Sequence, residues 1–455
     1  MSFRLYNTLS RKVEDFVPLN PPNVSLYTCG MTVYDYTHVG HLRKYTNDDL
    51  LKRALTYNGF KVKHVQNVTD VGHLVSDADE GEDKLEKGAK RTGQTVWEVA
   101  KFYEKHFYES LDQMNVLRPD VICRATEHID AQVELIKSLQ EKGFVYETSE
   151  ALFFDTSKFS DYGALSGQNL SDKKTGARED VVVDPNKKNP ADFALWFKRV
   201  GRFADHEMNW PSPWGNGFPG WHIECSAMAM KYLGAQIDIH TGGVDHIAVH
   251  HENEIAQSEG STGKHFANFW AHHEFLNIDG TKMSKSLQNF YTIEDVIKKG
   301  FSPMDLRYLF LTAHYRQKLN FTWEALEGAK RSLENLRSKL SGAMGGGGSV
   351  KKDAFVVALN EDLNIPKALA VVWDGLKDGS FGYEDILDFD RVLGLKLDEP
   401  SSSVKKEIPG NILVLAKKRD ELRSQKKFVE SDEIRKQIEK AGFIVKDTSS
   451  GTVVE

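Results

Sequence analysis

The sequence predicts an α/β protein, in which a parallel sheet with flanking helices is followed by a separate helical region. One observation is a strand–helix–strand pattern: β-forming residues at 24–28, a helical pattern at 41–58 that stops at Gly59, and a second strand at 61–68. Such a unit builds a parallel sheet, which binds ligands at the carboxyl ends of its strands, near helix N-termini. The other observation is a run of four glycines within 342–350, which indicates a linker.

The segments on either side of the linker have different characters. A helix at 131–142, a hairpin of two short strands at 144–146 and 152–154, and the polar stretch 160–189 read as an insertion in the α/β domain. Residues 233–240 and 266–276 again have the sequence pattern of β-strands. Beyond the linker, 354–395 is helical in pattern. Residues 404–446 then hold twelve Lys or Arg against seven Asp or Glu, which is typical of a solvated helix face or of a contact with a polyanion.

The composition excludes several classes of protein. A chain of 455 residues is expected to form about two to four domains. Its longest apolar run, 368–373, is far shorter than the roughly twenty residues of a membrane span, and residues 1–19 lack the core of a signal peptide. Three cysteines, at 29, 123 and 225, exclude a disulfide framework and predict a cytoplasmic protein. The net charge of −7 requires any nucleic acid to bind a local basic patch.

Two short motifs predict a nucleotide site. His38-Val39-Gly40-His41 lies after the first strand, at the start of the helix, where two imidazoles and free helical N–H groups can bind phosphate oxygens. Gly40 allows a flat ring such as adenine to approach the backbone. In Lys282-Met283-Ser284-Lys285-Ser286, two lysines three residues apart can neutralise a triphosphate under attack. Either motif alone is weak, and a single KxxK is usually an exposed basic loop, but the ordered pair is improbable by chance.

A third set of residues predicts a metal site. Cys29 follows the first strand, Cys225 lies within 220–226, and His250 and Glu254 are spaced so that a helix would place both on one face. Two thiolates, an imidazole and a carboxylate form a tetrahedral zinc set. His251, Glu252 and Asn253 compete as ligands, and the spacing does not separate His250 from His251. The sequence around Cys123 holds no comparable set of metal ligands, so Cys123 is interpreted as a small buried hydrophobic residue.

Together these segments resemble the cysteinyl-tRNA synthetase family of class I aminoacyl-tRNA synthetases. The resemblance covers about residues 3–452 and rests on Cys29, HVGH, the run GWHIECSAMA at 220–229, HTGGVDH with HHENEIAQS at 240–258, KMSKS, and DLNIPKAL at 362–369. The chain departs from the family pattern at 71–90 and 246–249. It also has Val453 where family members often carry a tryptophan.

The resemblance implies an α/β fold with a Rossmann-like class I synthetase catalytic domain that carries a connective insertion, followed by a helical anticodon-binding domain. The implied divisions run in chain order: 1–123, the first half of the catalytic domain with HVGH; 124–200, the insertion; 201–275, the second half with the zinc ligands; 276–341, a stem-contact fold with KMSKS; 342–350, the linker; 351–397, a helical bundle; and 398–455, a basic anticodon-binding segment.

The resemblance also implies a role for each motif. One zinc ion would be held by Cys29, Cys225, His250 and Glu254. His38 and His41 would steady the phosphate oxygens of ATP–Mg²⁺, and Lys282 with Lys285 would close over the leaving pyrophosphate. The remaining expected contacts are to ATP, from Gly40, Gly242, Gly243, Asp245 and Lys285, and to the amino acid, from Thr69, Trp221, His222, His240 and His251.

The expected function is the activation of L-cysteine with ATP and its transfer to tRNA(Cys) by a cytoplasmic monomer. A related ATP-dependent ligase that passes cysteine to an amino sugar would share the zinc site, HVGH and KMSKS, but it needs no anticodon reader. A nucleotidyltransferase would leave the zinc ligands and KMSKS unexplained. A non-catalytic RNA-binding paralogue is disfavoured, because every motif side chain is present.

Overall fold

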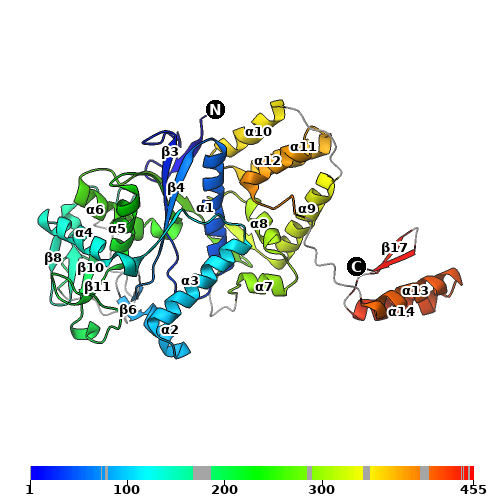
Figure 1. Ribbon diagram of the computed structural model, residues 1–455, viewed down its shortest axis with the longest axis horizontal. Helices are drawn as coiled ribbons and strands as arrows, with labels where there is room; N and C mark the ends of the chain where they lie inside the picture. Colours follow the sequence, from blue (N-terminus) through cyan, green and yellow to red (C-terminus); the bar gives the residue numbers. More distant parts are fainter. Residues whose placement is uncertain are drawn as a thin grey trace. The chain divides into compact units, whose positions relative to one another are not determined.

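The computed structural model divides into two compact units, residues 1–397 and 398–455 (Figure 1). The residues that it describes are 2–72, 74–76, 80–167, 186–283, 289–341, 349–399, 409–441, 443, 445–448 and 451–454. Within these residues, none of the helices combines the length and the apolar character that crossing a bilayer requires.

A five-stranded parallel sheet forms the centre of the first unit and confirms the predicted fold class. Its order is β13–β12–β3–β4–β7, with every neighbouring pair parallel. The strands are β3 (Asn23–Thr28), β4 (Lys61–Val68), β7 (Val121–Arg124), β12 (Ile237–Gly243) and β13 (Ala267–His273). The strand expected from residue 233 begins only at Ile237, because the preceding helix continues to Leu233 and ends at Gly234, which has a φ of 94°.

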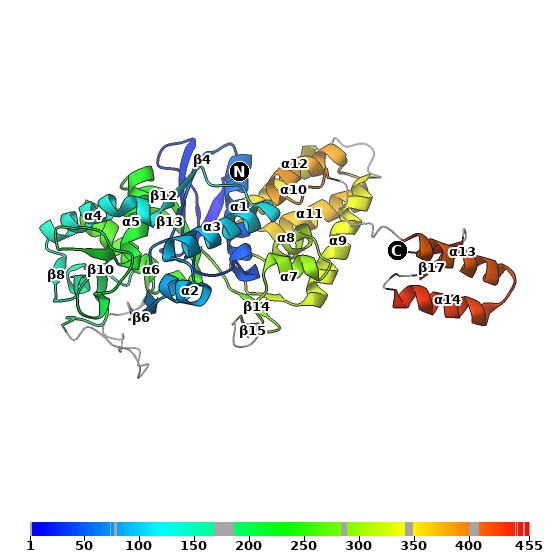
Figure 2. The same ribbon diagram turned by 60° about the horizontal axis from the view of Figure 1, so that its bottom comes forward.

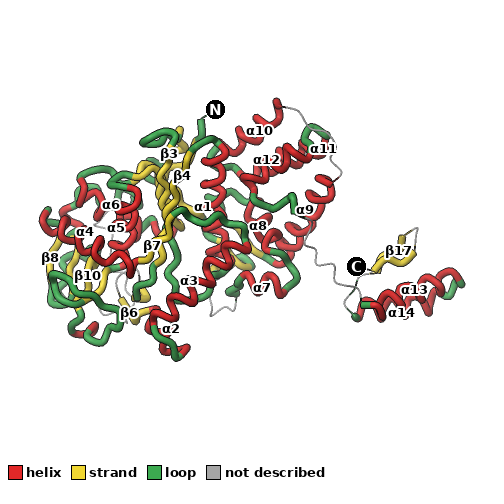
Figure 3. The backbone as a smooth tube through the Cα atoms, in the orientation of Figure 1, coloured by secondary structure: helices red, strands yellow, loops and turns green. Residues whose placement is uncertain are grey.

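Helices cover both faces of this sheet, as Figures 1 and 3 show. Leu26 of β3 packs in one cluster with Leu42, while the neighbouring Tyr27 packs in another with Met228, because successive strand residues face opposite sides. The helices are α1 (Val39–Tyr57) and α3 (Val96–Gln113) on one side, and α4 (Ile129–Glu141), α5 (Trp221–Leu233) and α6 (His250–Thr262) on the other. Lys44, in the second turn of α1, donates to the carbonyl oxygen of Cys29, so the start of α1 lies at the carboxyl end of β3.

The sequence between β7 and α5 forms a second, antiparallel sheet. Its four strands, β8 (Val145–Glu147), β9 (Ala151–Phe154), β10 (Phe193–Lys198) and β11 (Gly217–Pro219), lie in the order β11–β10–β9–β8. The hairpin expected at 144–154 is the pair β8–β9. Because β11 pairs with β10, this sheet reaches beyond residue 200, where the expected insertion ends. Most of the polar stretch 160–189 lies outside the described residues.

Short elements complete the α/β part of the unit. One hairpin, β1 (Arg4–Asn7) and β2 (Lys12–Asp15), is antiparallel, and β1 lies beside β13. A second hairpin, β5 (Leu74–Ser76) and β6 (Glu80–Asp83), precedes α2 (Lys84–Thr92), which packs on α3 (Figure 2).

Residues 276–393 are joined to α1 by a buried ion pair. Arg307 donates to Asp49 of α1 at 2.5 Å and to the carbonyl oxygen of Leu393 at 2.8 Å, so the helices after β13 are anchored to the α/β part. The elements are β14 (Leu276–Ile278), β15 (Thr281–Lys282), α7 (Ile293–Lys298), α8 (Pro303–Leu311), β16 (Leu319–Phe321), α9 (Trp323–Ser341), α10 (Ser349–Asn360), α11 (Ile365–Asp378) and α12 (Tyr383–Leu393). Of the predicted linker, 342–348 lie outside the described residues, and 349 and 350 begin α10.

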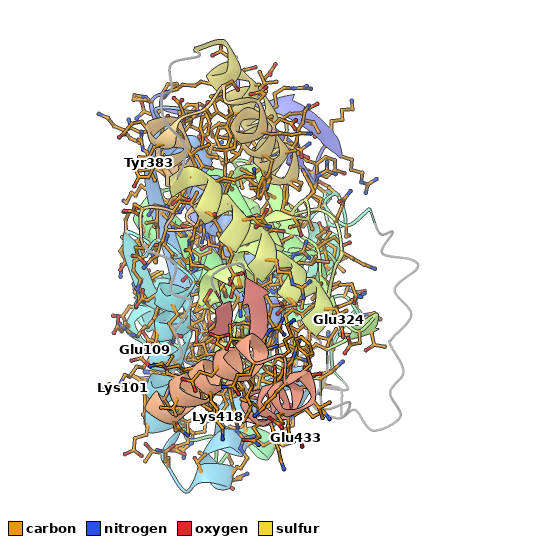
Figure 4. All side chains as sticks on the ribbon, turned by 90° about the vertical axis from the view of Figure 1, so that its right-hand side faces the viewer. Lys101, Glu109, Glu324, Tyr383, Lys418 and Glu433 are labelled. Carbon is orange, nitrogen blue, oxygen red and sulfur yellow. The ribbon has the colours of Figure 1, made fainter. Side chains whose placement is uncertain are left out.

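The second unit is a helical pair with a small hairpin. Its elements are α13 (Gly410–Ser424), α14 (Phe428–Lys440), β17 (Val445–Thr448) and β18 (Gly451–Val454). A cluster that includes Ile412, Ile434 and Ile438 holds the two helices together. Charged side chains of both signs, such as Lys418 and Glu433, lie on the outer faces (Figure 4).

Candidate active site and metal centre

The structure brings the four predicted metal ligands together. Cys29 follows β3, Cys225 lies in the second turn of α5, and His250 and Glu254 lie one turn apart in α6. All four are buried, and their ligand atoms lie within 4.8 Å of one another, so they could hold a metal ion. The sulfur atoms of Cys29 and Cys225 are 3.9 Å apart. Two zinc–sulfur bonds of about 2.3 Å in a tetrahedron would separate the sulfur atoms by about 3.8 Å, so the donor set fits zinc.

The structure distinguishes some of the competing candidate ligands, His251, Glu252 and Asn253, from the metal site. Glu252 accepts hydrogen bonds from the backbone of Gly163 and Ser166, and Asn253 accepts one from Tyr162, so both side chains face the insertion. His251 remains close to the site, with its Nε2 3.4 Å from the Cys29 sulfur. A second group that could hold a metal consists of Cys29, His240, His251 and Glu254.

A ring of histidines surrounds the metal ligands. His240 Nε2 lies 2.9 Å from Glu254 Oε2, and His222 Nδ1 lies 2.9 Å from His250 Nδ1. The Trp221 ring lies 4.5 Å from that of His250. Thr69, at the end of β4, is buried and lies within reach of Glu224 of α5. Of the five residues predicted for the amino-acid pocket, four therefore contact a predicted metal ligand, and Thr69 contacts Glu224, the residue before Cys225.

The ionisation of the side chains in this cluster favours the binding of a cation. A hydrogen bond from the Cys29 thiol, together with His250, lowers the pKa of Cys225 to about 7, although burial opposes this shift. Burial also opposes ionisation of Glu254, yet His240 and His250 hold the pKa of this carboxyl well below its usual range. Burial raises the pKa of Cys29, which lies against both anions. A metal ion would relieve this repulsion by replacing protons.

The HVGH motif forms the first turn of α1. His38 is the N-cap and accepts from the His41 backbone, and the two rings stack with centroids 3.5 Å apart. Burial lowers the pKa of His41 well below its ordinary value. A Cβ on Gly40 would lie 3.2 Å from the methyl carbon of Met283, so the KMSKS segment reaches the HVGH turn. Lys282 is exposed at the end of β15, and Lys285 lies outside the described residues.

The predicted nucleotide turn follows β12 directly. A Cβ on Gly242 would lie 2.4 Å from the ring of His251, and one on Gly243 would lie 2.2 Å from Asp245 Oδ1. Glycine at 242 therefore lets this turn approach the histidine ring, whereas at 243 the Asp245 side chain would have to move. Asp245 is exposed, in a position to meet a ligand.

Sequence reasoning missed several buried or partly buried groups at the same edge of the sheet. His246 and His272 lie against His251, and Lys44 with Asp48 lies below the HVGH turn. The concentration of histidines at 240–273 was a signal for the first two. The pattern gave no signal for Asp48, because a carboxylate within an apparently amphipathic helix is normally exposed.

Comparisons with known proteins agree with this geometry. Residues 15–331 match the family model for the tRNA synthetases class I (C) catalytic domain. A cysteine–tRNA ligase of Treponema denticola is 43% identical over 99% of this chain and 99% of its own. Cysteine–tRNA ligase 1 of Burkholderia lata is 46% identical, covering 99% and 96%. A cysteine–tRNA ligase of Bacteroides fragilis is 40% identical, covering 98% and 97%.

A solved structure shows the same fold at a greater distance. Mycobacterium tuberculosis methionyl-tRNA synthetase in complex with methionyl-adenylate superposes with a TM-score of 0.57 and 16% identity, over 82% of this chain and 88% of that one. The full-length relatives and the family model together confirm the resemblance inferred from the motifs. The chain therefore belongs to the cysteine–tRNA ligase family of class I aminoacyl-tRNA synthetases.

Proposed function

We propose that the protein activates L-cysteine with ATP–Mg²⁺ to cysteinyl-adenylate and transfers the cysteine to the 3′ end of tRNA(Cys). The observation that carries this proposal is the buried convergence of Cys29, Cys225, His250 and Glu254 beside the nucleotide motifs. Full-length similarity to cysteine–tRNA ligases supports the choice of reaction. We further propose a cytoplasmic monomer, with unit 398–455 binding the anticodon end.

The central physical problem is the selection of cysteine over serine. An apolar pocket separates such similar side chains by only about 10²-fold, whereas protein synthesis needs roughly 10⁴-fold or more. A zinc ion held by the four ligands would supply a soft Lewis acid that binds a thiolate far better than a hydroxyl group. His240 and His222 orient Glu254 and His250 by hydrogen bonds, which is the usual role of residues behind a metal ligand.

The other motif residues bind and orient ATP. The N-terminus of α1, with His38 and His41, binds phosphate oxygens, and the turn at 242–245 binds the ribose. Lys282 and Lys285 close over the pyrophosphate. These groups act by position and charge, and none forms a covalent bond with the substrate.

The test is amino-acid-dependent exchange of pyrophosphate into ATP, followed by transfer to an acceptor. We expect exchange with cysteine, at least about 10⁴-fold less with serine, and charging of tRNA(Cys). Transfer of cysteine to an amino sugar but not to tRNA would favour the related ligase. A protein without any cysteine-dependent exchange would contradict the proposal.

A further inference from the structure

A buried carboxylate joins α1 to two strands at the carboxyl edge of the parallel sheet. Asp48, on α1, accepts from the Thr241 hydroxyl at 2.7 Å and lies 2.7 Å from His273 Nε2. Its other oxygen lies 2.8 Å from Lys44 Nζ. Lys44 donates in turn to the carbonyl oxygen of Cys29 at 2.6 Å. Asp48 therefore ties α1 to β12 and β13, and Lys44 ties α1 to the residue after β3.

The Asp48 end of the ion pair is buried, and the Lys44 end is partly exposed. The side chain of Asp48 is 3% exposed and that of Lys44 is 15% exposed. Burial opposes ionisation of Asp48, but Lys44 and His273 hold the pKa of its carboxyl well below the usual range. The positive charge of Lys44 is therefore fixed in place, with little screening by solvent.

The position of this charge is central to the proposed reaction. Lys44 lies one turn after His41 on α1 and is bonded to the backbone of Cys29, so it stands between the HVGH turn and the metal ligands. Its charge also acts on His41, Cys29 and His246. Among the described residues, Lys44 Nζ contacts Asp48 and the carbonyl oxygen of Cys29 and lies 4.3 Å from the centre of the Tyr45 ring. An ammonium group offers three donors, so a substrate carboxylate can accept the third.

We propose that Lys44 belongs to the adenylation site and binds the reacting carboxylate of the amino acid, and that Asp48 holds Lys44 in position. This inference rests on the proposed function. In this reaction a bond forms between a carboxylate oxygen and the α-phosphorus of ATP, and the bond from that phosphorus to the pyrophosphate oxygen breaks. The thiol end of the substrate would lie at Cys29 and Cys225, and the phosphate at His41. The carboxylate must then lie between them, where Lys44 supplies a preorganised cation.

The same helix offers a matched control for this residue. Lys52 Nζ donates to the carbonyl oxygen of Arg118 at 3.1 Å and lies 3.3 Å from Asp120, and its side chain is 11% exposed. Lys52 thus has the same pair of partner types as Lys44, but at the amino end of the sheet, before β7. Its replacement removes a mostly buried lysine and its ion pair with the half-exposed Asp120, far from the proposed reaction.

The experiment compares Lys44→Met, Lys44→Arg, Asp48→Asn and Lys52→Met in the full-length, zinc-loaded protein. Cysteine-dependent ATP–pyrophosphate exchange, zinc content and melting temperature are measured for each variant. We expect kcat for Lys44→Met to fall about 10²-fold below that of Lys52→Met, with equal zinc content and a similar melting temperature. Lys44→Arg keeps the charge and should recover at least tenfold of this loss. Asp48→Asn should lower kcat less than Lys44→Met. The double variant Lys44→Met/Asp48→Asn should be no slower than Lys44→Met alone, because Asp48 acts through Lys44.

Equal kcat values for Lys44→Met and Lys52→Met would overturn the inference. Loss of zinc from Lys44→Met, or no recovery in Lys44→Arg, would also overturn it, because Lys44 would then act only through the fold. If Lys44→Met does not fold, the comparison of Asp48→Asn with Lys52→Met decides by the same criteria. A wild-type protein that is inactive with cysteine overturns the proposed function itself, and with it this inference, whereas an active wild type isolates the role of Lys44.

Discussion

The two cysteines of the metal cluster differ sharply from the third in what they contact. Cys225 lies against Cys29 and His250, whereas Cys123 is packed in a buried apolar cluster and its thiol donates to the backbone carbonyl of Gln66. We expect Cys225→Ser to lose stoichiometric zinc and cysteine activation, because an alcohol is a weak zinc ligand. Cys123→Ser should keep both. Elemental analysis and pyrophosphate exchange measure the two effects, and a Cys225→Ser protein with full zinc content would remove this residue from the ligand set.

The low pKa of His64 makes the free energy of unfolding depend on pH. It is buried on β4 against the Thr28 hydroxyl, and burial lowers its pKa to about 3. The unfolded chain binds a proton at His64 below about pH 6.5, whereas the folded protein stays neutral there down to about pH 3. The free energy of unfolding should therefore fall as the pH drops, by about 1.6 kcal/mol between pH 6.5 and 5. Urea unfolding at both pH values measures this fall.

The matched variants for this prediction are His64→Gln and His265→Gln. Glutamine at 64 keeps a hydrogen-bonding group near Thr28 but does not titrate, so this contribution to the pH dependence should disappear. The His265 side chain is 79% exposed, and its replacement should leave the dependence unchanged. The same slope in all three proteins would mean that other groups cause the acid sensitivity.

At the scale of elements, the end of β3 is fixed by a close approach to β4. Gly30 donates its N–H to the Asn67 side chain at 2.7 Å, and a Cβ on Gly30 would lie 1.6 Å from the Asn67 carbonyl oxygen. Gly30→Ala must push the strand ends apart and move the adjacent Cys29. We expect the free energy of unfolding to fall by at least about 2 kcal/mol, and zinc affinity to fall with it.

A glycine in open space gives the control for this variant. A Cβ on Gly328 of α9 meets no atom within 4 Å among the described residues, so Gly328→Ala should raise stability by about 0.5–1 kcal/mol. Thermal unfolding and zinc titration compare the two. Undiminished zinc affinity in Gly30→Ala would show that Cys29 is placed without this contact.

Elements and motif positions were predictable from the sequence where a local pattern specified them. The strand predicted at 61–68 follows the helix-stopping Gly59, and its bounds are those of β4. Convergence of Cys29 with Cys225 was inferred from family resemblance, because no local rule relates residues almost two hundred positions apart. Asp48 and His273 could not be predicted, since their pairing arises only when α1 packs across the strand ends. The extent of the antiparallel sheet was missed because β11 is only three residues long.

At the scale of the whole molecule, the separation into two units predicts separable activities. Every proposed contact to cysteine and ATP lies within residues 1–397, and residues 398–455 form a unit of their own. Removal of 398–455 should leave cysteine-dependent pyrophosphate exchange within about twofold of the full chain. Binding of tRNA(Cys) should weaken, because the truncation removes basic side chains that neutralise phosphates.

The salt dependence of binding tests whether these basic side chains bind phosphates. Removing one lysine–phosphate pair should reduce the slope of log K against log salt by about 0.7–0.9. Lys417 and Lys418 are exposed neighbours on α13, so the double change to Gln should reduce the slope without altering the fold of the unit. Lys142, which is exposed, and Lys137, whose side chain is 41% exposed, are changed in the same way as the control for a general loss of charge. If the α13 variant and the truncated chain both charge tRNA(Cys) as the intact protein does, the basic segment is a solvated surface, and tRNA is held by the first unit alone.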